Sequence, residues 1–222
     1  MFLSIFTYVV VVNSFNLIDG VDGLAGSLGI LTTTIFGTFF WINGQTAHAI
    51  MAFTLTGSLI SFLIYNFPPA KIFMGDTGSL LVGLMNSILV IKFINFADSA
   101  LIPYPVLSTP ALGFAILIIP LFDTLRVFSI RIFSRRSPFS PDRNHIHHLL
   151  LDMGLSHKQT TLICLTASIT FIVISYLLQG LGATFVLSIL FSELSIDDSI
   201  CITSTSAMTR LPAPPSCPNA MT

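Results

Sequence analysis

The sequence has very few charged residues. Only 9% of its 222 residues are Asp, Glu, Lys or Arg, whereas 53% are hydrophobic and the mean hydropathy is +0.88. Soluble domains usually carry about 25% charged residues. This scarcity of charge excludes an ordinary soluble domain and predicts an integral membrane protein.

Cysteine is scarce as well. Cys164, Cys201 and Cys217 form no CxxC pair and no metal-binding spacing, which argues against a disulfide scaffold and a thiolate metal site. The first 15 residues are apolar but lack a basic segment and an A-x-A cleavage site. They therefore predict a membrane helix rather than a signal peptide.

Long apolar runs dominate the rest of the chain. A spanning helix needs roughly 20 mostly apolar residues, and such runs lie at 1–15, 26–42, 47–65, 79–97, 110–130 and 159–178, with a shorter one at 181–192. The runs are continuous rather than alternating, which disfavours a β-barrel. We predict an all-α, polytopic transmembrane helix bundle of about six to seven spans. This membrane domain covers residues 1–192, and a disordered or aberrant tail covers 193–222.

The basic residues indicate how the bundle is oriented. Most of them lie in the polar connections at 66–78 and 131–158, and counting spans places these on the same side as the loop at 16–25. By the positive-inside rule the three motif loops are on the cytoplasmic side of a multi-pass membrane protein. Lys92 lies inside a run, where its long stem is expected to reach the interface. His48 and His157 are isolated and are expected at the surface or the interface.

The first polar loop reads N-S-F-N-L-I-D-G-V-D-G-L-A-G at 13–26. Its Asn16, Asp19 and Asp22 are three residues apart, so on a helix they would share one broad face. Carboxylate and amide oxygens suit a hard cation or the hydroxyls of a sugar or nucleotide. A capped and solvated helix start is the alternative, but the complete motif favours a functional site.

The second polar loop places Asp76 between two glycines, immediately before a long apolar run. A carboxylate at this position can face a metal near the membrane surface, while the first N–H groups of the helix face a phosphate. The alternative is that Asp76 or Ser79 only caps the following helix.

Ionisable residues also lie inside the run at 110–130. Asp123 and Arg126 are three residues apart, so they are neighbours on one helix face and are expected to be paired inside the bundle. A purely structural pair and the floor of a site are both consistent with this pattern.

Three of the five histidines lie close together in the segment S-P-F-S-P-D-R-N-H-I-H-H at 137–148. An H-x-H-H pattern could supply nitrogen ligands to zinc. No thiolate accompanies it, however, and the oxygen-rich loops elsewhere suit Mg²⁺ or Mn²⁺ better. We interpret the segment as a wall that binds a diphosphate, through Arg143, His145, His147 and His148.

Four motifs occur in order between the apolar runs: N-x-x-N-x-x-D-G-x-D-G-L, F-x-G-D-x-G-S, P-x-x-D-x-x-R-V and S-P-F-x-x-D-R-x-H-I-H-H. In this order they resemble the polyprenyl-phosphate N-acetylhexosamine-1-phosphate transferases. The resemblance implies transfer of GlcNAc-1-phosphate from UDP-GlcNAc to undecaprenyl phosphate, with release of UMP. This reaction would begin a cell-envelope polysaccharide pathway such as lipopolysaccharide or cell-wall synthesis.

The same resemblance implies roles for individual residues. Asp19, Asp22 and Asp76 would be catalytic, and Asp76 and Asn16 would hold Mg²⁺, with Mn²⁺ as the alternative. The diphosphate and sugar would be bound by Asn16, Arg143, His145, His147 and His148. The implied partners are UDP-GlcNAc, undecaprenyl phosphate and membrane lipid, with a homodimer as a further alternative and no nucleic acid.

One family feature is missing from its usual place. Members carry an adjacent Asp-Asp pair in an earlier cytoplasmic loop, whereas the only such pair in this sequence is Asp197-Asp198, in the tail. We therefore expect the sequence to correspond to a C-terminal part of such an enzyme. Two alternatives stay open: an inactive remnant that keeps partial UDP-sugar and metal binding, and a transporter that uses Asp123, Arg126 and the loop carboxylates.

Overall fold

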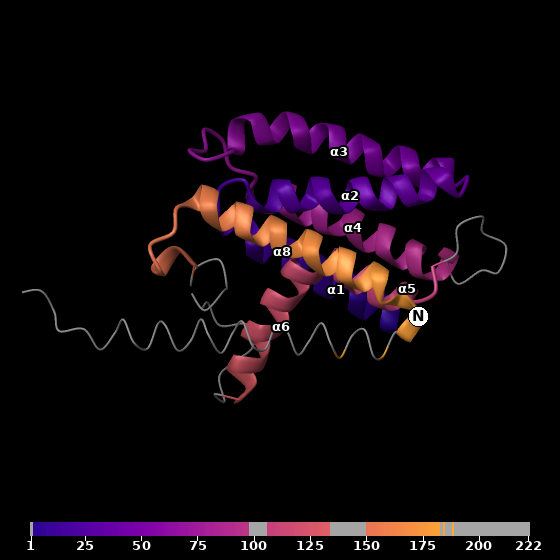
Figure 1. Ribbon diagram of the computed structural model, residues 1–222. Coiled ribbons are helices and arrows are strands. Elements are labelled where there is room, and N and C mark those ends of the chain that lie inside the picture. Colours follow the sequence, from indigo (N-terminus) through magenta and orange to yellow (C-terminus); the bar gives the residue numbers. More distant parts are fainter. Residues whose placement is uncertain (1, 98–105, 134–149, 183, 185–187, 189–222) are drawn as a thin grey trace, which may run out of the picture.

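The computed structural model describes residues 2–97, 106–133, 150–182, 184 and 188. Within these residues the chain is helical and contains no strand (Figure 1), which confirms the all-α prediction. The helices are α1 Phe2–Leu17, α2 Leu24–Ile42, α3 Thr46–Asn66, α4 Gly75–Ala97, α5 Thr109–Ile116, α6 Ile118–Phe133 and α8 His157–Leu177, and the 3₁₀ turns are η1 Ile18–Gly20 and η2 Gln179–Leu181.

Among the described residues, five segments are long and apolar enough to cross a membrane, and a sixth span is formed if α5 and α6 are counted as one. The protein is therefore a multi-pass membrane protein, as predicted. The five are Phe2–Gly20, Leu24–Ile42, Thr46–Asn66, Gly75–Phe96 and His157–Leu177. Most of the predicted run at 181–192 and the whole predicted tail at 193–222 lie outside the described residues.

The predicted span at 110–130 is wrong in one respect, because it is not one straight helix. α5 and α6 meet at Leu117 with a bend of 83°. Pro120 explains the break, since it has no N–H and its ring disfavours a continuous helix through the preceding turn, while the first turn of a new helix tolerates it. Mean hydropathy cannot detect such a break.

α2 and α3 form a tightly packed antiparallel hairpin (Figure 1). Small residues allow the close approach: a Cβ added to Gly37 would lie 2.9 Å from the Phe53 ring. The buried hydroxyls of Thr33 and Thr56 share a hydrogen bond of 2.8 Å across the interface. Helices in lipid rely on such small-residue packing and interhelical hydrogen bonds, because burial of apolar surface drives their association little.

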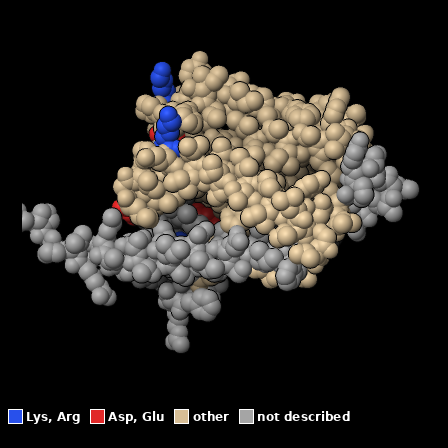
Figure 2. All heavy atoms as spheres, in the orientation of Figure 1, with Lys and Arg blue, Asp and Glu red and all other residues tan. Residues whose placement is uncertain are grey.

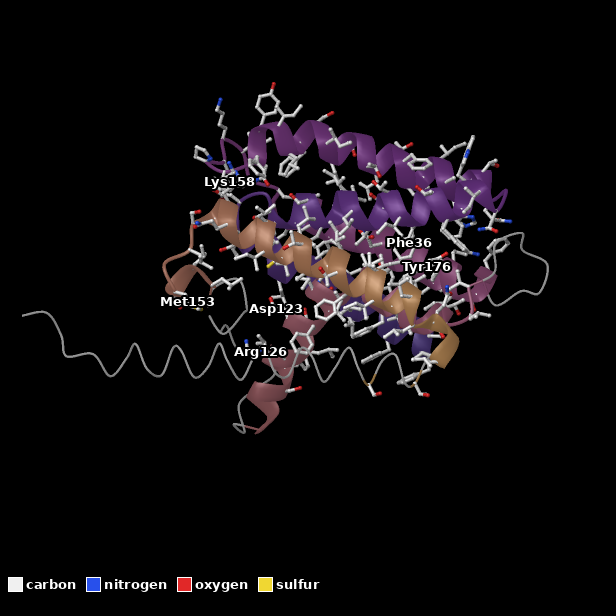
Figure 3. All side chains as sticks on the ribbon, viewed as in Figure 1. Phe36, Asp123, Arg126, Met153, Lys158 and Tyr176 are labelled. Carbon is white, nitrogen blue, oxygen red and sulfur yellow. The ribbon has the colours of Figure 1, made fainter. Side chains whose placement is uncertain are left out.

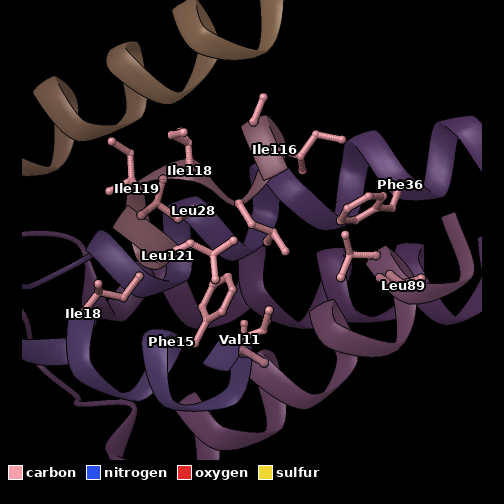
Figure 4. Close-up of a cluster of buried hydrophobic side chains, with 14 of the residues drawn as sticks. Val11, Phe15, Ile18, Leu28, Phe36, Leu89, Ile116, Ile118, Ile119 and Leu121 are labelled. Carbon is pink, nitrogen blue, oxygen red and sulfur yellow. The ribbon is translucent and has the colours of Figure 1, made fainter. Parts of the chain in front are cut away.

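α1 and α4 approach each other still more closely. A Cβ added to Gly83 of α4 would lie 2.7 Å from Cα of Val12 on α1, so the two backbones are in direct contact at this point. Figure 4 shows Val11 and Phe15 of α1 facing Leu121 of α6 within the same core, and all three side chains are buried. This packing fixes how the end of α1 lies beside the start of α4.

The two ends of the bundle differ in polarity. The ends of α1 and α3 and the starts of α2, α4 and α8 meet at one end, and the turn between α2 and α3 lies at the other (Figure 1). Figure 2 shows basic side chains, with acidic residues close by, at the first end of the visible face. Lys71 and Lys158 lie there and are exposed. The first and second polar loops and the start of α8 therefore converge on one end of the bundle.

Candidate active site

The end of α1 is hydrogen-bonded to the start of α4 by one amide side chain. Nδ2 of Asn16 donates to Oδ1 of Asp76 at 3.2 Å and to Oγ of Ser79 at 2.9 Å. Asn16 is half-buried, Ser79 is buried and Asp76 is exposed. Ser79 in turn donates to the Gly75 carbonyl at 3.1 Å, one turn after the start of α4, and is therefore not its cap. The exposed carboxylate of Asp76 is thus held by Asn16, which is itself hydrogen-bonded to the buried Ser79.

Asp19 joins this group from η1, where it is half-buried. Its carboxylate accepts a hydrogen bond from the backbone N–H of Gly75 and interacts electrostatically with Asp76. Gly75 adopts a left-handed φ of 66°, which favours glycine and places its N–H toward Asp19 at the start of α4. The structure therefore brings Asn16, Asp19 and Asp76 together, although Asp76 comes from a different loop.

This donor set fits a magnesium ion. Asp19 and Asp76 are like charges in one cluster, so a divalent cation between them would offset their repulsion. All the available donors are oxygens, which hard cations prefer, and Mg²⁺ commonly binds one or two carboxylates together with substrate phosphates. The described residues contain no group of three His, Cys, Asp or Glu side chains that could enclose a metal. Oxygens of a substrate phosphate would suit further positions on such an ion.

Asp22 makes a different set of contacts. Its Oδ2 accepts from the Ala70 N–H at 3.3 Å and lies 3.6 Å from Nδ1 of His157, and its own N–H donates to the same ring nitrogen at 3.3 Å. Its carbonyl accepts from the Thr161 hydroxyl at 3.0 Å. Asp22 therefore links the first polar loop to the second loop and to the start of α8.

Asn66 strengthens the same link from the end of α3. Its Oδ1 accepts from the Gly23 N–H at 3.0 Å, and its Nδ2 donates to the Ile72 carbonyl at 2.8 Å. Gly23 has a left-handed φ of 76°, and an added Cβ would meet Cδ of Pro68 at 3.2 Å, so both conformation and space require glycine there. The two polar loops are thus held in a fixed relation beside the carboxylate cluster.

These contacts predict that removal of the Asp22 carboxylate and removal of the Asp76 carboxylate have different effects on stability. Asp22→Ala leaves the Ala70 N–H without its acceptor and removes the carboxylate beside His157, so we expect a loss of about 1 kcal/mol in the free energy of unfolding. Asp76→Ala removes an exposed charge that repels Asp19 and one long hydrogen bond from Asn16, whose Nδ2 still donates to Ser79, so stability should change little. Thermal unfolding of the purified chain in detergent compares the two variants. Equal destabilisation of both would contradict the distinction drawn between Asp22 and Asp76.

Asp123 and Arg126 lie on α6, as Figure 3 shows, and both are almost fully buried, with 1% and 9% of their surfaces exposed. Asp123 interacts electrostatically with Cys164 of α8, which α6 contacts. The expected position inside the bundle is therefore confirmed for both residues. A role of Asp123 and Arg126 as the floor of the site stays a prediction.

Other predicted site residues are not placed. Arg143, His145, His147 and His148 lie outside the described residues. Sequence reasoning missed the positioning role of Asn66 and treated His157 only as a surface histidine. The local signal near His157 is the capping box of Ser156 and Gln159, which marks the start of α8. Nothing local to these residues indicates that they contact the first polar loop.

The bundle of membrane-spanning helices therefore carries two carboxylates and an amide grouped at one end, and such oxygen ligands suit a divalent cation. Residues 1–94 match the sequence model of glycosyl transferase family 4. The undecaprenyl-phosphate alpha-N-acetylglucosaminyl 1-phosphate transferase of Escherichia coli is 34% identical over 173 residues, which cover 76% of this chain and 45% of that protein.

Two further relatives come from distant bacteria. The probable undecaprenyl-phosphate N-acetylglucosaminyl 1-phosphate transferase of Bacillus subtilis is 33% identical over 189 residues, 85% of this chain and 51% of that protein. The decaprenyl-phosphate N-acetylglucosaminephosphotransferase of Mycobacterium leprae is 36% identical over 174 residues, 72% and 44% of the two chains. The chain is thus similar to glycosyl transferase family 4 over residues 1–94 and to these transferases over most of its own length. It spans about half the length of the curated relatives it matches.

Proposed function

We propose that this protein transfers GlcNAc-1-phosphate from UDP-GlcNAc to undecaprenyl phosphate, giving a polyprenyl-diphosphate-linked sugar and UMP. The observation that carries the proposal is the convergence of Asn16, Asp19 and Asp76 where the end of α1 meets the start of α4. The names of the relatives supply the acceptor class and the sugar. The reaction would take place on the cytoplasmic face of a bacterial inner membrane and begin a cell-envelope polysaccharide pathway.

The proposed chemistry needs the chain mainly to position charges. An oxygen of the acceptor phosphate forms a bond to the β-phosphorus of UDP-GlcNAc, and the bond from that phosphorus to the oxygen of UMP breaks. Phosphoryl transfer depends on positioning and on stabilisation of charge. Asp76 and Asn16 would hold Mg²⁺, or Mn²⁺ in its place, together with Asp19, and the metal would offset the charge that develops on UMP. The hydrogen bond from Asn16, which also donates to the buried Ser79, keeps the Asp76 carboxylate oriented.

The proposed reaction can be tested in membranes that contain the full chain. UMP release from UDP-GlcNAc should require both undecaprenyl phosphate and Mg²⁺, should stop when the metal is chelated and should return when Mg²⁺ or Mn²⁺ is added. Membranes without the chain provide the background. Binding of UDP-GlcNAc without UMP release would assign the chain to the remnant alternative, and the absence of both would contradict the proposed function.

A further inference from the structure

A polar pocket lies at the end of the bundle opposite Asn16, Asp19 and Asp76. It has a volume of about 200 Å³ and is formed by the end of α2, the turn after it, the first turn of α3 and the last turns of α4. Figure 1 shows this α2–α3 turn at the far end of the helices from the loop between α3 and α4. The pocket is lined by Phe40, Gln45, His48, Lys92, Asn95 and Phe96.

The charge of the described lining is positive. Lys92 contributes an ammonium group, two amides and an imidazole contribute further polar atoms, and the lining contains no carboxylate. Lys92 is exposed within an apolar helix, close to the end of α4, where its stem can carry the charge to the membrane interface. A basic residue at that depth attracts anionic lipid headgroups.

His48 supplies an unsatisfied polar atom beside this charge. Its ring packs against Phe40 with 5.2 Å between centroids. Its Nδ1 is buried and has no hydrogen-bond partner among the described residues. Buried polar atoms in proteins are normally paired. His48 lines the pocket, and a ring N–H of its imidazole would donate to an anionic oxygen bound there.

The start of α3 adds a third favourable element. Gln45 precedes this helix and makes no side-chain capping hydrogen bond. The first N–H groups of a helix have no intrahelical acceptor, and the helix dipole makes this end favourable for an anion. The ammonium group of Lys92, the imidazole of His48 and the open start of α3 therefore border one space.

We propose that this pocket binds the phosphate group of an anionic phospholipid, in the leaflet opposite the candidate active site. Two features favour a lipid over free phosphate. Phe40 and Phe96 give the pocket apolar walls that suit the glycerol and acyl region next to a headgroup. Trp41, beside Phe40 in the sequence, is 61% exposed at the end of α2, the position of an interfacial aromatic residue.

The single tryptophan of the chain makes the proposal measurable. The full chain is reconstituted in phosphatidylcholine vesicles that contain increasing fractions of brominated phosphatidylglycerol or brominated phosphatidylcholine, and quenching of Trp41 fluorescence is recorded. We expect phosphatidylglycerol to be preferred by about fivefold, the selectivity that one lysine near the surface provides. Lys92→Gln and His48→Phe should reduce this preference to near one.

Matched variants separate this site from general charge attraction. Lys92→Arg keeps the charge and should keep the preference. Lys71→Gln removes an exposed lysine from the other end of the bundle and should also keep it. Equal quenching by the two lipids in the original chain, or an equal loss in Lys71→Gln, would overturn the proposal. Loss of the preference on addition of inorganic phosphate would assign the pocket to free phosphate and would overturn the lipid assignment.

Discussion

Replacing Asp76 by Asn is expected to reduce Mg²⁺-dependent UMP release by at least about 100-fold while leaving the fold intact. The carboxylate is exposed, so the substitution removes one negative charge from a solvated position. The Asn oxygen can still accept from Nδ2 of Asn16, which keeps the packing of α1 against α4. Only the charge that would hold the metal is lost. UMP release is measured in membranes supplied with UDP-GlcNAc and undecaprenyl phosphate.

Asp152→Asn is the matched control for this variant. Asp152 is an exposed carboxylate outside the cluster, so its neutralisation should leave UMP release unchanged. The helical circular dichroism of both variants should equal that of the original chain. Full turnover in Asp76→Asn would refute the assignment of Asp76 to the metal, and comparable loss in both variants would indicate a general effect of surface charge.

Gly83→Ala is expected to disturb the candidate site from within the membrane. The new methyl group would lie 2.7 Å from Cα and 2.9 Å from the carbonyl oxygen of Val12, and backbone atoms cannot rotate away as a side chain can. α1 and α4 must therefore separate, which we expect to lower the free energy of unfolding by about 1–3 kcal/mol. The same movement shifts Asn16 relative to Asp76. Because a misplacement of about 1 Å can lower a rate by about 100-fold, UMP release should fall strongly.

Gly57→Ala provides the matched control. Gly57 lies in α3, and an added Cβ would meet nothing within 4 Å. Alanine is favoured over glycine in a helix by roughly 0.5–1 kcal/mol, so this variant should be as stable as the original chain or slightly more stable. Thermal unfolding and UMP release are measured for both variants. If Gly83→Ala keeps its stability and activity, the close packing of α1 and α4 does not position the site.

The positions of the helices could largely be predicted from apolar runs, because a membrane span needs a long continuous stretch and little else. The bend between α5 and α6 could not, because hydropathy is averaged over a window and Pro120 changes that average little. Pro120 itself is the sequence feature that indicates the break between α5 and α6. It stands in the first turn of α6, where a helix start tolerates it.

The candidate site was predictable only in part. The spacing of Asn16 and Asp19 places them near each other, but their contact with Asp76 depends on the packing of α1 against α4, which no local pattern reveals. The same spacing does not keep Asp22 with them. α1 ends at Leu17 and the chain turns through η1, so the helical period no longer applies and Asp22 meets His157 instead.

The binding of Mn²⁺ together with UDP-GlcNAc tests the central claim most directly. Electron paramagnetic resonance of the full chain, with Mn²⁺ in place of Mg²⁺, reports both the bound ion and its magnetic coupling to the phosphorus nuclei of the nucleotide. We predict a bound Mn²⁺ signal with phosphorus coupling in the original chain and in Asp152→Asn, and its loss in Asp76→Asn and Asp19→Asn. A coupled signal that persists unchanged in the last two variants would contradict a metal and diphosphate site at the junction of α1 and α4.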